Sequence, residues 1–190
     1  MHLGAVMATL APTARLSLQR VLDWDRETLV RVARTRTAVW TVFMRVVTLP
    51  PVWVTLLLLG VAQGDHGEFW PAALAGGVVA GMSSLLVQPL KFAVRRRRPV
   101  LHAIVTTLDR YSFPSGHSTT AFALAVGALF AAPAFFPVAL GLAAVVAFSR
   151  VYLGVHYLSD VVGGAVVGVL VGVLLFTSEL PAWAAGLLTS

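Results

Sequence analysis

The segment SRVYLGVHYLSD, Ser149 to Asp160, places a cation, a histidine and a carboxylate at the end of an apolar stretch. His156 and Asp160 are four residues apart, so on a helix they would share one face. A carboxylate there can accept the imidazole Nδ1–H, which leaves Nε2 as a lone pair for nucleophilic or base chemistry. A polar pair at a helix end would also explain these two residues, but it would not explain Arg150.

A second candidate is YSFPSGHSTT, which precedes a long apolar segment. Pro114 suits the first turn of a helix, where its missing N–H costs nothing. Ser115, Gly116 and His117 would then present free backbone N–H groups to an anion at the positive end of the helix dipole. Gly116 would let a phosphate approach the backbone, and His117 could donate a proton to it. For this segment alone, a polar helix end remains the simpler interpretation.

The third candidate is the basic run KFAVRRRRP. Positions seven apart nearly superpose on a helix, so one face is predicted to carry Lys91, Arg95 and Arg98. The two intervening arginines would point elsewhere, and Pro99 would end the helix. Three cations on one face could hold a phosphate. A polybasic loop that binds anionic lipid or sets topology is an equally good reading.

The composition limits the reactions and ligands that these residues could serve. The chain has 190 residues, of which 58% are hydrophobic and 12% charged, and it has a formal net charge of +6. With no cysteine, thiolate nucleophiles, disulfides and Cys-ligated metals are excluded. His117, His156 and Asp160 could bind a metal, but the surrounding cations favour an anion instead. Basic residues interleaved with apolar stretches favour anionic or phosphorylated lipid over nucleic acid.

Long apolar blocks predict an all-α, polytopic membrane helix bundle with about five to six transmembrane helices. The blocks are Val46–Ala62, Phe69–Leu90, Ser118–Ala132, Pro137–Leu153 and Val161–Thr177. Pro50 and Pro51 predict a kink in the first block or a late start of its helix. We expect one domain over residues 1–190, with the catalytic motifs in 91–160 and an N-terminal arm in 1–40. Within this arm, Arg15–Arg34 has the pattern of an interfacial amphipathic helix, a solvated charged arm being the alternative.

Glycines recur every four residues in two of the blocks, at positions Gly77 and Gly81 and again at Gly164, Gly168 and Gly172. Small residues on one face let helix backbones approach closely. We predict that both sets pack within the monomer rather than between copies of the chain.

Together the clusters read Lys91-x6-Arg98-Pro99, Pro114-Ser115-Gly116-His117 and Ser149-Arg150-x5-His156-x3-Asp160. This resembles the tripartite signature of the type 2 phosphatidic acid phosphatase superfamily, whose members include lipid phosphate phosphatases and undecaprenyl pyrophosphate phosphatases. The apolar blocks on either side fit the membrane branch of that family. Any one part of the signature is weak, but the three in order are specific.

The resemblance implies a role for each matching residue. His156 would attack phosphorus to form a phosphohistidine, Asp160 would orient His156, and His117 would serve as general acid and then base. The phosphate oxygens would be held by a cationic and polar set: Lys91, Arg98, Arg150, Ser115 and Gly116. No metal and no cofactor are implied. The other arginines of the basic run lie at unspecified positions, where they are auxiliary or interfacial.

The implied activity is hydrolysis of a lipid phosphomonoester or pyrophosphate. Undecaprenyl pyrophosphate is the favoured substrate, with phosphatidate or phosphatidylglycerophosphate next. Phosphotransfer to an acceptor other than water, or non-catalytic binding of anionic lipid, are the alternatives. We expect a multi-pass protein of the plasma or inner membrane, with no nucleic-acid partner and no obligate protein partner. Many bacterial relatives act on the outer face, which favours an extracytoplasmic site, although the positive-inside rule favours the opposite side.

Overall fold

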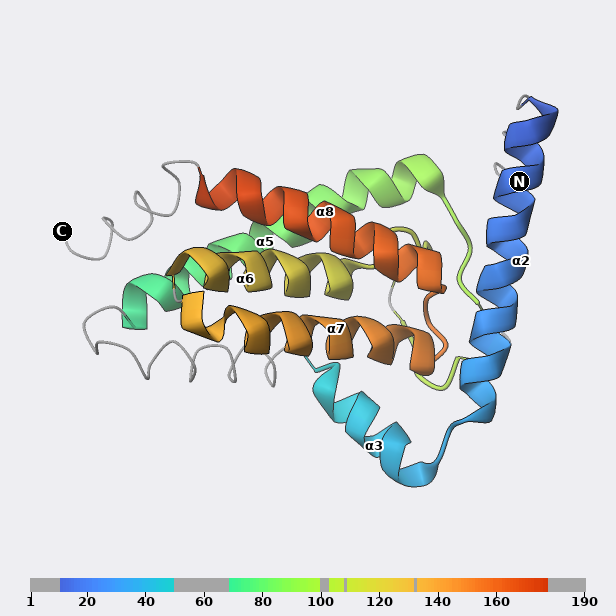
Figure 1. The fold of residues 1–190 in the computed structure, drawn as a ribbon, viewed down its shortest axis with the longest axis horizontal. Coiled ribbons are helices and arrows are strands. Elements are labelled where there is room, and N and C mark those ends of the chain that lie inside the picture. Colours follow the sequence, from blue (N-terminus) through green and yellow to red (C-terminus); the bar gives the residue numbers. More distant parts are fainter. Residues whose placement is uncertain (1–10, 50–68, 100–102, 108, 132, 178–190) are drawn as a thin grey trace.

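The regular elements are all helices. The computed structural model describes residues 11–49, 69–99, 103–107, 109–131 and 133–177. Its elements are α2 (Pro12–Arg34), α3 (Ala38–Val47), α5 (Phe69–Val94), α6 (Gly116–Ala131), the 3-10 helix η2 (Pro133–Phe135), α7 (Phe136–Tyr152) and α8 (Leu158–Phe176). One isolated antiparallel bridge joins Arg97 to Tyr111. The helices α5 to α8 run alongside one another, and α2 crosses one end of this bundle (Figure 1).

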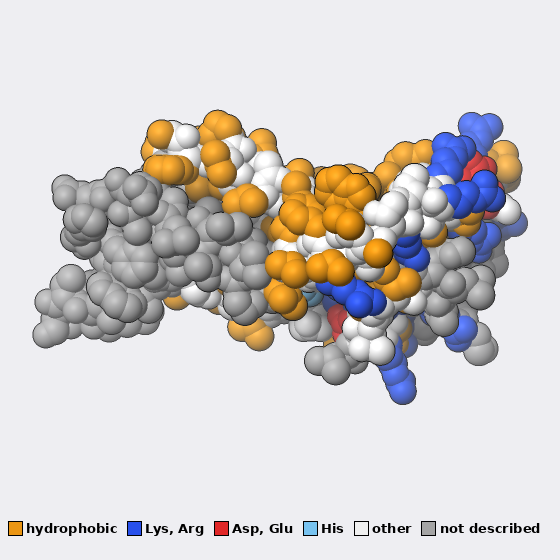
Figure 2. Space-filling view, turned by 90° about the horizontal axis from the view of Figure 1, so that it is seen from below, with side chains coloured by type: hydrophobic (Ala, Val, Ile, Leu, Met, Phe, Trp, Pro, Cys, Tyr) orange, Lys and Arg blue, Asp and Glu red, His pale blue; other side chains and the backbone are white. Residues whose placement is uncertain are grey.

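Among the described residues, three helical segments are long and apolar enough to cross a membrane: Gly76–Val94, Pro133–Tyr152 and Leu158–Phe176. The helix α6 is shorter, with 16 residues, as its predicted block was. Large apolar side chains such as Leu85 and Leu170 point outward, and Figure 2 shows apolar side chains over the middle of the bundle, with Lys and Arg gathered toward the α2 end. The prediction of a polytopic membrane helix bundle is confirmed. Most of the first predicted block, with Pro50 and Pro51, lies outside the described residues.

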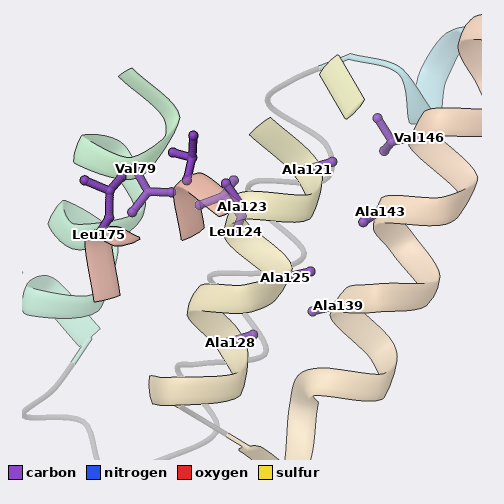
Figure 3. Packing of buried hydrophobic residues seen from close by; sticks show 11 residues of the cluster. Val79, Ala121, Ala123, Leu124, Ala125, Ala128, Ala139, Ala143, Val146 and Leu175 are labelled. Carbon is purple, nitrogen blue, oxygen red and sulfur yellow. The ribbon is translucent and has the colours of Figure 1, made fainter. Parts of the chain in front are cut away.

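The helix α6 lies at the centre of the bundle and packs against α5, α7 and α8. Its contact with α7 is built mainly from alanines: Ala121 and Ala125 of α6 face Ala139 and Ala143 of α7 (Figure 3). Small side chains bring the two backbones close together and so increase the dispersion contacts between them. Within a membrane such contacts hold helices together, because the hydrophobic effect does not act between them there.

Glycines make the contact between α8 and α6 closer still. A Cβ added at Gly168 would lie 2.3 Å from the Thr119 carbonyl oxygen, and one at Gly164 would lie 2.6 Å from that of Ser115. This confirms the prediction of packing within the monomer for α8. For Gly77 and Gly81 of α5 it stays a prediction, since a Cβ there would meet nothing within 4 Å among the described residues.

Two N-terminal helices pack on the end of the bundle. The predicted amphipathic helix is present as α2, which contacts α7 and α8 and buries only Asp25 and Leu29. After a short connection, Thr37 begins α3 by accepting a hydrogen bond from the Trp40 N–H over 3.3 Å. The helix α3 packs on α7, and this brings its last turn next to the end of α7 that carries Arg150.

Candidate active site

The three predicted clusters meet at one end of the bundle. Lys91 lies in the last turn of α5, His117 in the first turn of α6, Arg150 in the last turn of α7 and Asp160 in the first turn of α8. Side chains from all three clusters line a cavity of about 730 Å³. Six of the eight predicted site residues line it: Lys91, Arg98, Gly116, His117, Arg150 and His156. The other two, Ser115 and Asp160, are fully buried and do not belong to its wall.

His156 sits between a carboxylate and a guanidinium. Its Nδ1 lies 3.6 Å from Oδ2 of Asp160, longer than a hydrogen bond but close enough to become one through a small shift. Its Nε2 lies 3.0 Å from Nη1 of Arg98. A guanidinium can only donate, so Nε2 is the acceptor and the ring proton of the neutral imidazole is on Nδ1, facing Asp160. This is the predicted tautomer, but the predicted shared helical face is wrong, because His156 lies in the turn before α8 and only Asp160 is in the helix.

The environment of His156 holds the ring neutral. Burial lowers its pKa from 6.5 to about 4; Asp160 opposes this shift, and the positive charges of Arg98 and Arg150 reinforce it. An imidazole without a proton on Nε2 is the reactive form for attack on an electrophile. The site therefore supplies a lone pair at Nε2 throughout the neutral pH range.

Asp109, which the sequence did not single out, pairs with both cations of the first motif. Lys91 Nζ and Arg98 Nη2 each donate to its carboxylate, and Arg98 Nε donates to its carbonyl oxygen over 3.1 Å. Burial raises the pKa of the Asp109 carboxyl, but the hydrogen bonds and charges of Lys91 and Arg98 outweigh it, so the pKa lies below the ordinary value. A carboxylate thus lies where two phosphate-binding cations converge.

Arg150 also lines the cavity. The residue is 6% exposed and donates from Nη1 to the Thr48 hydroxyl over 2.6 Å. Its buried Nε has no partner among the described residues. An unsatisfied guanidinium N–H at a cavity wall favours an anionic ligand. Two further residues line the cavity: Arg45 in the last turn of α3, and Thr48 directly after that helix. No local sequence pattern indicated either one.

The start of α6 differs in part from its prediction. The helix begins at Gly116, so Pro114 precedes the first turn instead of lying in it. The Ser115 N–H is not free, because it donates to the Asp160 carbonyl oxygen over 3.0 Å, and the Ser115 hydroxyl accepts from Ser118 over 3.0 Å. The first of these bonds joins the SGH segment to α8, and the second lies at the start of α6. Only Gly116 and His117 of the segment face the cavity.

The basic run also differs from its prediction. The helix α5 ends at Val94, and Arg95 takes a positive φ of 50°, so Lys91, Arg95 and Arg98 do not share a helical face. Beyond Val94, Arg96 is partly buried whereas Arg95 is exposed. Arg96 binds two buried carboxylates, whereas the resemblance implies only an auxiliary or interfacial role for it.

In the part of the chain that the structure describes, no group of three His, Cys, Asp or Glu side chains lies close enough to hold a metal ion. His156 instead has cations on the cavity side, at Arg98 and Arg150. The residues present suit an anion such as phosphate.

A membrane helix bundle that brings a neutral histidine, a second histidine and a set of cations around one cavity has the architecture of a membrane phosphatase. Residues 72–183 match the PAP2 superfamily. The chain belongs to this superfamily, which confirms the family that the three motifs indicated. Its relatives are named as phosphatases.

Relatives of known function hydrolyse lipid phosphates. The chain is 41% identical to decaprenylphosphoryl-5-phosphoribose phosphatase of Mycobacterium tuberculosis over 128 residues, 64% of this chain and 68% of that protein. It is 31% identical to phosphatidylglycerophosphatase B of Bacillus subtilis over 126 residues, 60% of this chain and 61% of that protein.

Solved structures agree on the fold. A crystal structure of a transmembrane PAP2-type phosphatidylglycerolphosphate phosphatase from Bacillus subtilis superposes with a TM-score of 0.66 at 26% identity, covering 83% of this chain and 85% of that one. Aquifex aeolicus LpxE gives a TM-score of 0.61 at 22% identity, covering 80% and 94%, which supports the fold alone.

Proposed function

We propose that this chain removes phosphate from an isoprenoid lipid through a phosphohistidine at His156. The observation that carries the proposal is the Nε2 lone pair of His156, which faces a cavity lined by Lys91, Arg98 and Arg150. A nucleophile beside several fixed cations suits attack on a phosphoryl group, whose oxygens carry charge that the cations can stabilise without reorganising.

Two half-reactions complete the proposed cycle. In the first, Nε2 of His156 forms a bond to phosphorus while the bond from phosphorus to the leaving oxygen breaks, and His117 gives that oxygen a proton. In the second, His117 takes a proton from water, the water oxygen bonds to phosphorus, and the P–N bond breaks to restore His156 and release phosphate. Asp160 faces Nδ1 throughout and stabilises the positive charge that develops on the ring.

The proposed substrate is a prenyl-linked sugar phosphate. This choice is supported by the 41% identity to the decaprenylphosphoryl-5-phosphoribose phosphatase and by the size of the cavity. At about 730 Å³ it falls within the roughly 300–1,000 Å³ of sites that hold whole small molecules, which exceeds the needs of one phosphate. Thr106, Thr107 and Gln88 in its wall offer hydrogen bonds to hydroxyl groups. Undecaprenyl pyrophosphate, favoured by sequence, is the second candidate because the same cations could hold two phosphates.

The deciding experiment measures phosphate release by detergent-purified protein from four lipids: decaprenylphosphoryl-5-phosphoribose, undecaprenyl pyrophosphate, phosphatidylglycerophosphate and phosphatidate. We expect the first to give the highest kcat/KM, with no loss in EDTA and with inhibition by vanadate, a mimic of pentacoordinate phosphorus. His156→Ala and His117→Ala should be nearly inactive. Radiolabelled substrate should leave acid-labile phosphate on the wild type and none on His156→Ala. Full activity in His156→Ala would refute the mechanism.

Phosphotransfer is distinguished from hydrolysis in the same assay. Added alcohols compete with water for the phosphohistidine, so a phosphotransferase would place most of the phosphate on the alcohol. A non-catalytic lipid-binding protein would retain lipid without releasing phosphate from any substrate in the panel.

We also propose that the site opens on the extracytoplasmic side, which the resemblance to bacterial relatives supports. The chain contains no cysteine, so a single Arg97→Cys in the exposed loop beside the site reports the sidedness directly. A membrane-impermeant maleimide should label this variant in intact cells. Labelling only after the cells are lysed would place the site in the cytoplasm.

A further inference from the structure

A buried chain of charged groups links Asp160 to two residues that the proposed reaction does not use directly, Arg96 and Asp25. Arg96 donates from Nη2 to Oδ2 of Asp25 over 2.7 Å and from Nη1 to Oδ1 of Asp160 over 2.8 Å. The Asp25 and Asp160 side chains are 0% exposed and that of Arg96 is 11% exposed. The three residues come from α2, the loop after α5 and the first turn of α8.

Arg96 fixes the rotation of the Asp160 carboxylate. With Oδ1 held by Arg96, Oδ2 accepts the Tyr157 N–H over 2.8 Å and faces Nδ1 of His156. The guanidinium also lies over the Tyr157 ring, with its Cζ 4.2 Å from the ring centroid, which restrains the plane of Arg96 itself. The oxygen that faces His156 is therefore selected by contacts on the other oxygen.

Asp25 extends this arrangement to the N-terminal helix. Its Oδ1 accepts the Ser159 backbone N–H over 2.9 Å, and its Oδ2 accepts the Ser159 hydroxyl as well as Arg96. The Ser159 N–H belongs to the first turn of α8, where backbone donors lack partners within the helix. A carboxylate of α2 thus caps the helix that carries Asp160.

The burial of these charges calls for a function beyond anchoring α2. Burying a charge is costly unless it is paired and hydrogen-bonded, and α2 buries only one other side chain, Leu29. Its apolar face and basic residues would suffice for attachment to a membrane surface. Neither Arg96 nor Asp25 lines the cavity, so neither is placed to contact the phosphate.

We propose that Arg96 and Asp25 are positioning residues that hold Asp160 against His156, and that the amphipathic helix α2 is in this way part of the active-site scaffold. The inference rests on the proposed function, in which His156 is the nucleophile. It predicts that α2 is required for the rate of the chemical step and not for substrate binding.

Three substitutions test the proposal by kinetics. Arg96→Met should lower kcat by about 10- to 100-fold, the usual effect of losing a residue that orients a reacting group, while KM changes by less than about twofold. Asp25→Asn keeps the side-chain shape and should lower kcat by about three- to tenfold. Arg96→Lys should recover only part of the rate, because an ammonium cannot bridge two carboxylates as the guanidinium fork does. Arg97→Met and Asp23→Asn, both at exposed positions, are the matched controls and should behave as wild type.

A second readout separates positioning from a merely structural role. The groups that face His156 are Asp160, Arg98, Arg150 and His117. In Arg96→Met the Asp160 charge is no longer shared, so it stabilises the imidazolium more strongly and the acid limb of kcat/KM should move to higher pH. Arg96→Lys, which keeps the charge, should restore the limb. The ring ¹⁵N shifts of His156 should change in Arg96→Met and remain unchanged in Arg97→Met.

The outcomes are distinguishable. A folded Arg96→Met protein with the kcat and pH profile of wild type overturns the proposal. A folded Arg96→Met protein also overturns it if kcat falls while the acid limb of kcat/KM and the His156 ¹⁵N shifts stay unchanged. If Arg96→Met does not fold, wild-type kcat and ¹⁵N shifts in Asp25→Asn overturn it. If wild type releases no phosphate from any lipid, the proposed function fails, whereas altered His156 ¹⁵N shifts in Arg96→Met still support the positioning role.

Discussion

Nη1 of Arg98 lies 3.0 Å from Nε2 of His156, so a cation of the first motif occupies the lone pair of the proposed nucleophile. The same guanidinium donates to the Val155 carbonyl oxygen over 2.8 Å and pairs with Asp109. For attack on phosphorus, the Arg98 N–H that donates to Nε2 must donate its hydrogen bond to a phosphate oxygen instead. Binding of the phosphate would therefore both neutralise Arg98 and uncover the nucleophile.

The pH dependence of the reaction should reflect the lowered pKa of His156. The neutral ring is required, and burial, with help from Arg98 and Arg150, lowers its pKa from 6.5 to about 4. Titration of the His156 ring by ¹⁵N NMR should therefore show no protonation between pH 7 and about 5, and protonation near 4. Without substrate, this measurement is free of the second ionisation of a phosphate ester, near pH 6. A midpoint at 6.5 would contradict the prediction.

The same lowered pKa predicts a loss of stability in acid. The folded-state pKa lies below the unfolded value, so the unfolded chain binds this proton first as the pH falls. The contribution of His156 to the free energy of unfolding is complete above pH 6.5 and declines from there to about pH 4. In thermal unfolding in detergent, wild type should lose more Tm than His156→Gln over this interval. Equal losses would show that His156 does not contribute.

Asp109→Asn should strengthen phosphate binding. The wild-type carboxylate neutralises Lys91 and Arg98, and an anionic substrate must displace it. Without that charge, we expect the KM and the inhibition constant of vanadate to fall by up to about tenfold, which corresponds to about 1.4 kcal/mol. Glu27→Gln, which removes an exposed carboxylate paired with Arg31 on α2, should change neither. A higher KM in Asp109→Asn would mean that Asp109 holds the cations in place for substrate.

Thr48→Val should weaken substrate binding through Arg150. The Thr48 hydroxyl is the acceptor for Arg150 Nη1, over 2.6 Å, and the substitution leaves a buried cation with one partner fewer. Removing a hydrogen bond to a charged group costs roughly 1.5–3 kcal/mol, so kcat/KM should fall by about 10- to 100-fold. Thr35→Val, at an exposed hydroxyl that bonds only to the Val32 carbonyl, is the control. An unchanged kcat/KM in Thr48→Val would show that Arg150 is held by other contacts.

Gly168→Ala should destabilise the bundle, because its Cβ would lie 2.3 Å from the Thr119 carbonyl oxygen and 3.0 Å from the Phe122 Cβ. Overpacking of this kind typically costs about 1–3 kcal/mol, seen as a lower Tm in detergent. Gly81→Ala on α5 is the matched control, since its Cβ would meet nothing within 4 Å and alanine has the higher helix propensity by about 1 kcal/mol. Its Tm should be equal or higher. A similar fall in both variants would contradict close packing of α8 on α6.

The sequence predicted the helical class from the apolar length of its blocks, and the convergence of the three motifs from their resemblance to a family signature. It failed where the backbone leaves the helix. His156 lies before α8 and shares no helix with Asp160, although the two side chains are adjacent. Arg95 adopts a positive φ, and this one residue decides that Arg96 and not Arg95 turns inward. No periodicity of side chains reports such a reversal.

The missed residues share a cause. Asp25, Thr48 and Asp109 lie 135, 102 and 18 residues from the groups they serve: Asp160, Arg150 and Lys91. Each is an ordinary polar residue in its own neighbourhood. The one available signal was charge, since Asp25 and Asp109 are acidic residues in strongly basic stretches. The packing of α2 and α3 on the end of the bundle gives Asp25 and Thr48 their partners, and the loop that carries Asp109 meets the end of α5.

The glycine contact between α8 and α6 has a consequence for how such an enzyme can change over evolution. Close backbone contact from Gly164 to Gly172 fixes the relative register of α6, whose first turn carries His117, and α8, whose first turn carries Asp160. The spacing between His117 and Asp160 thus depends on atoms outside the cavity wall. The outward side chains of α8, such as Leu170 and Leu174, are free to diverge, so the protein can adapt to a new lipid tail without altering its chemistry.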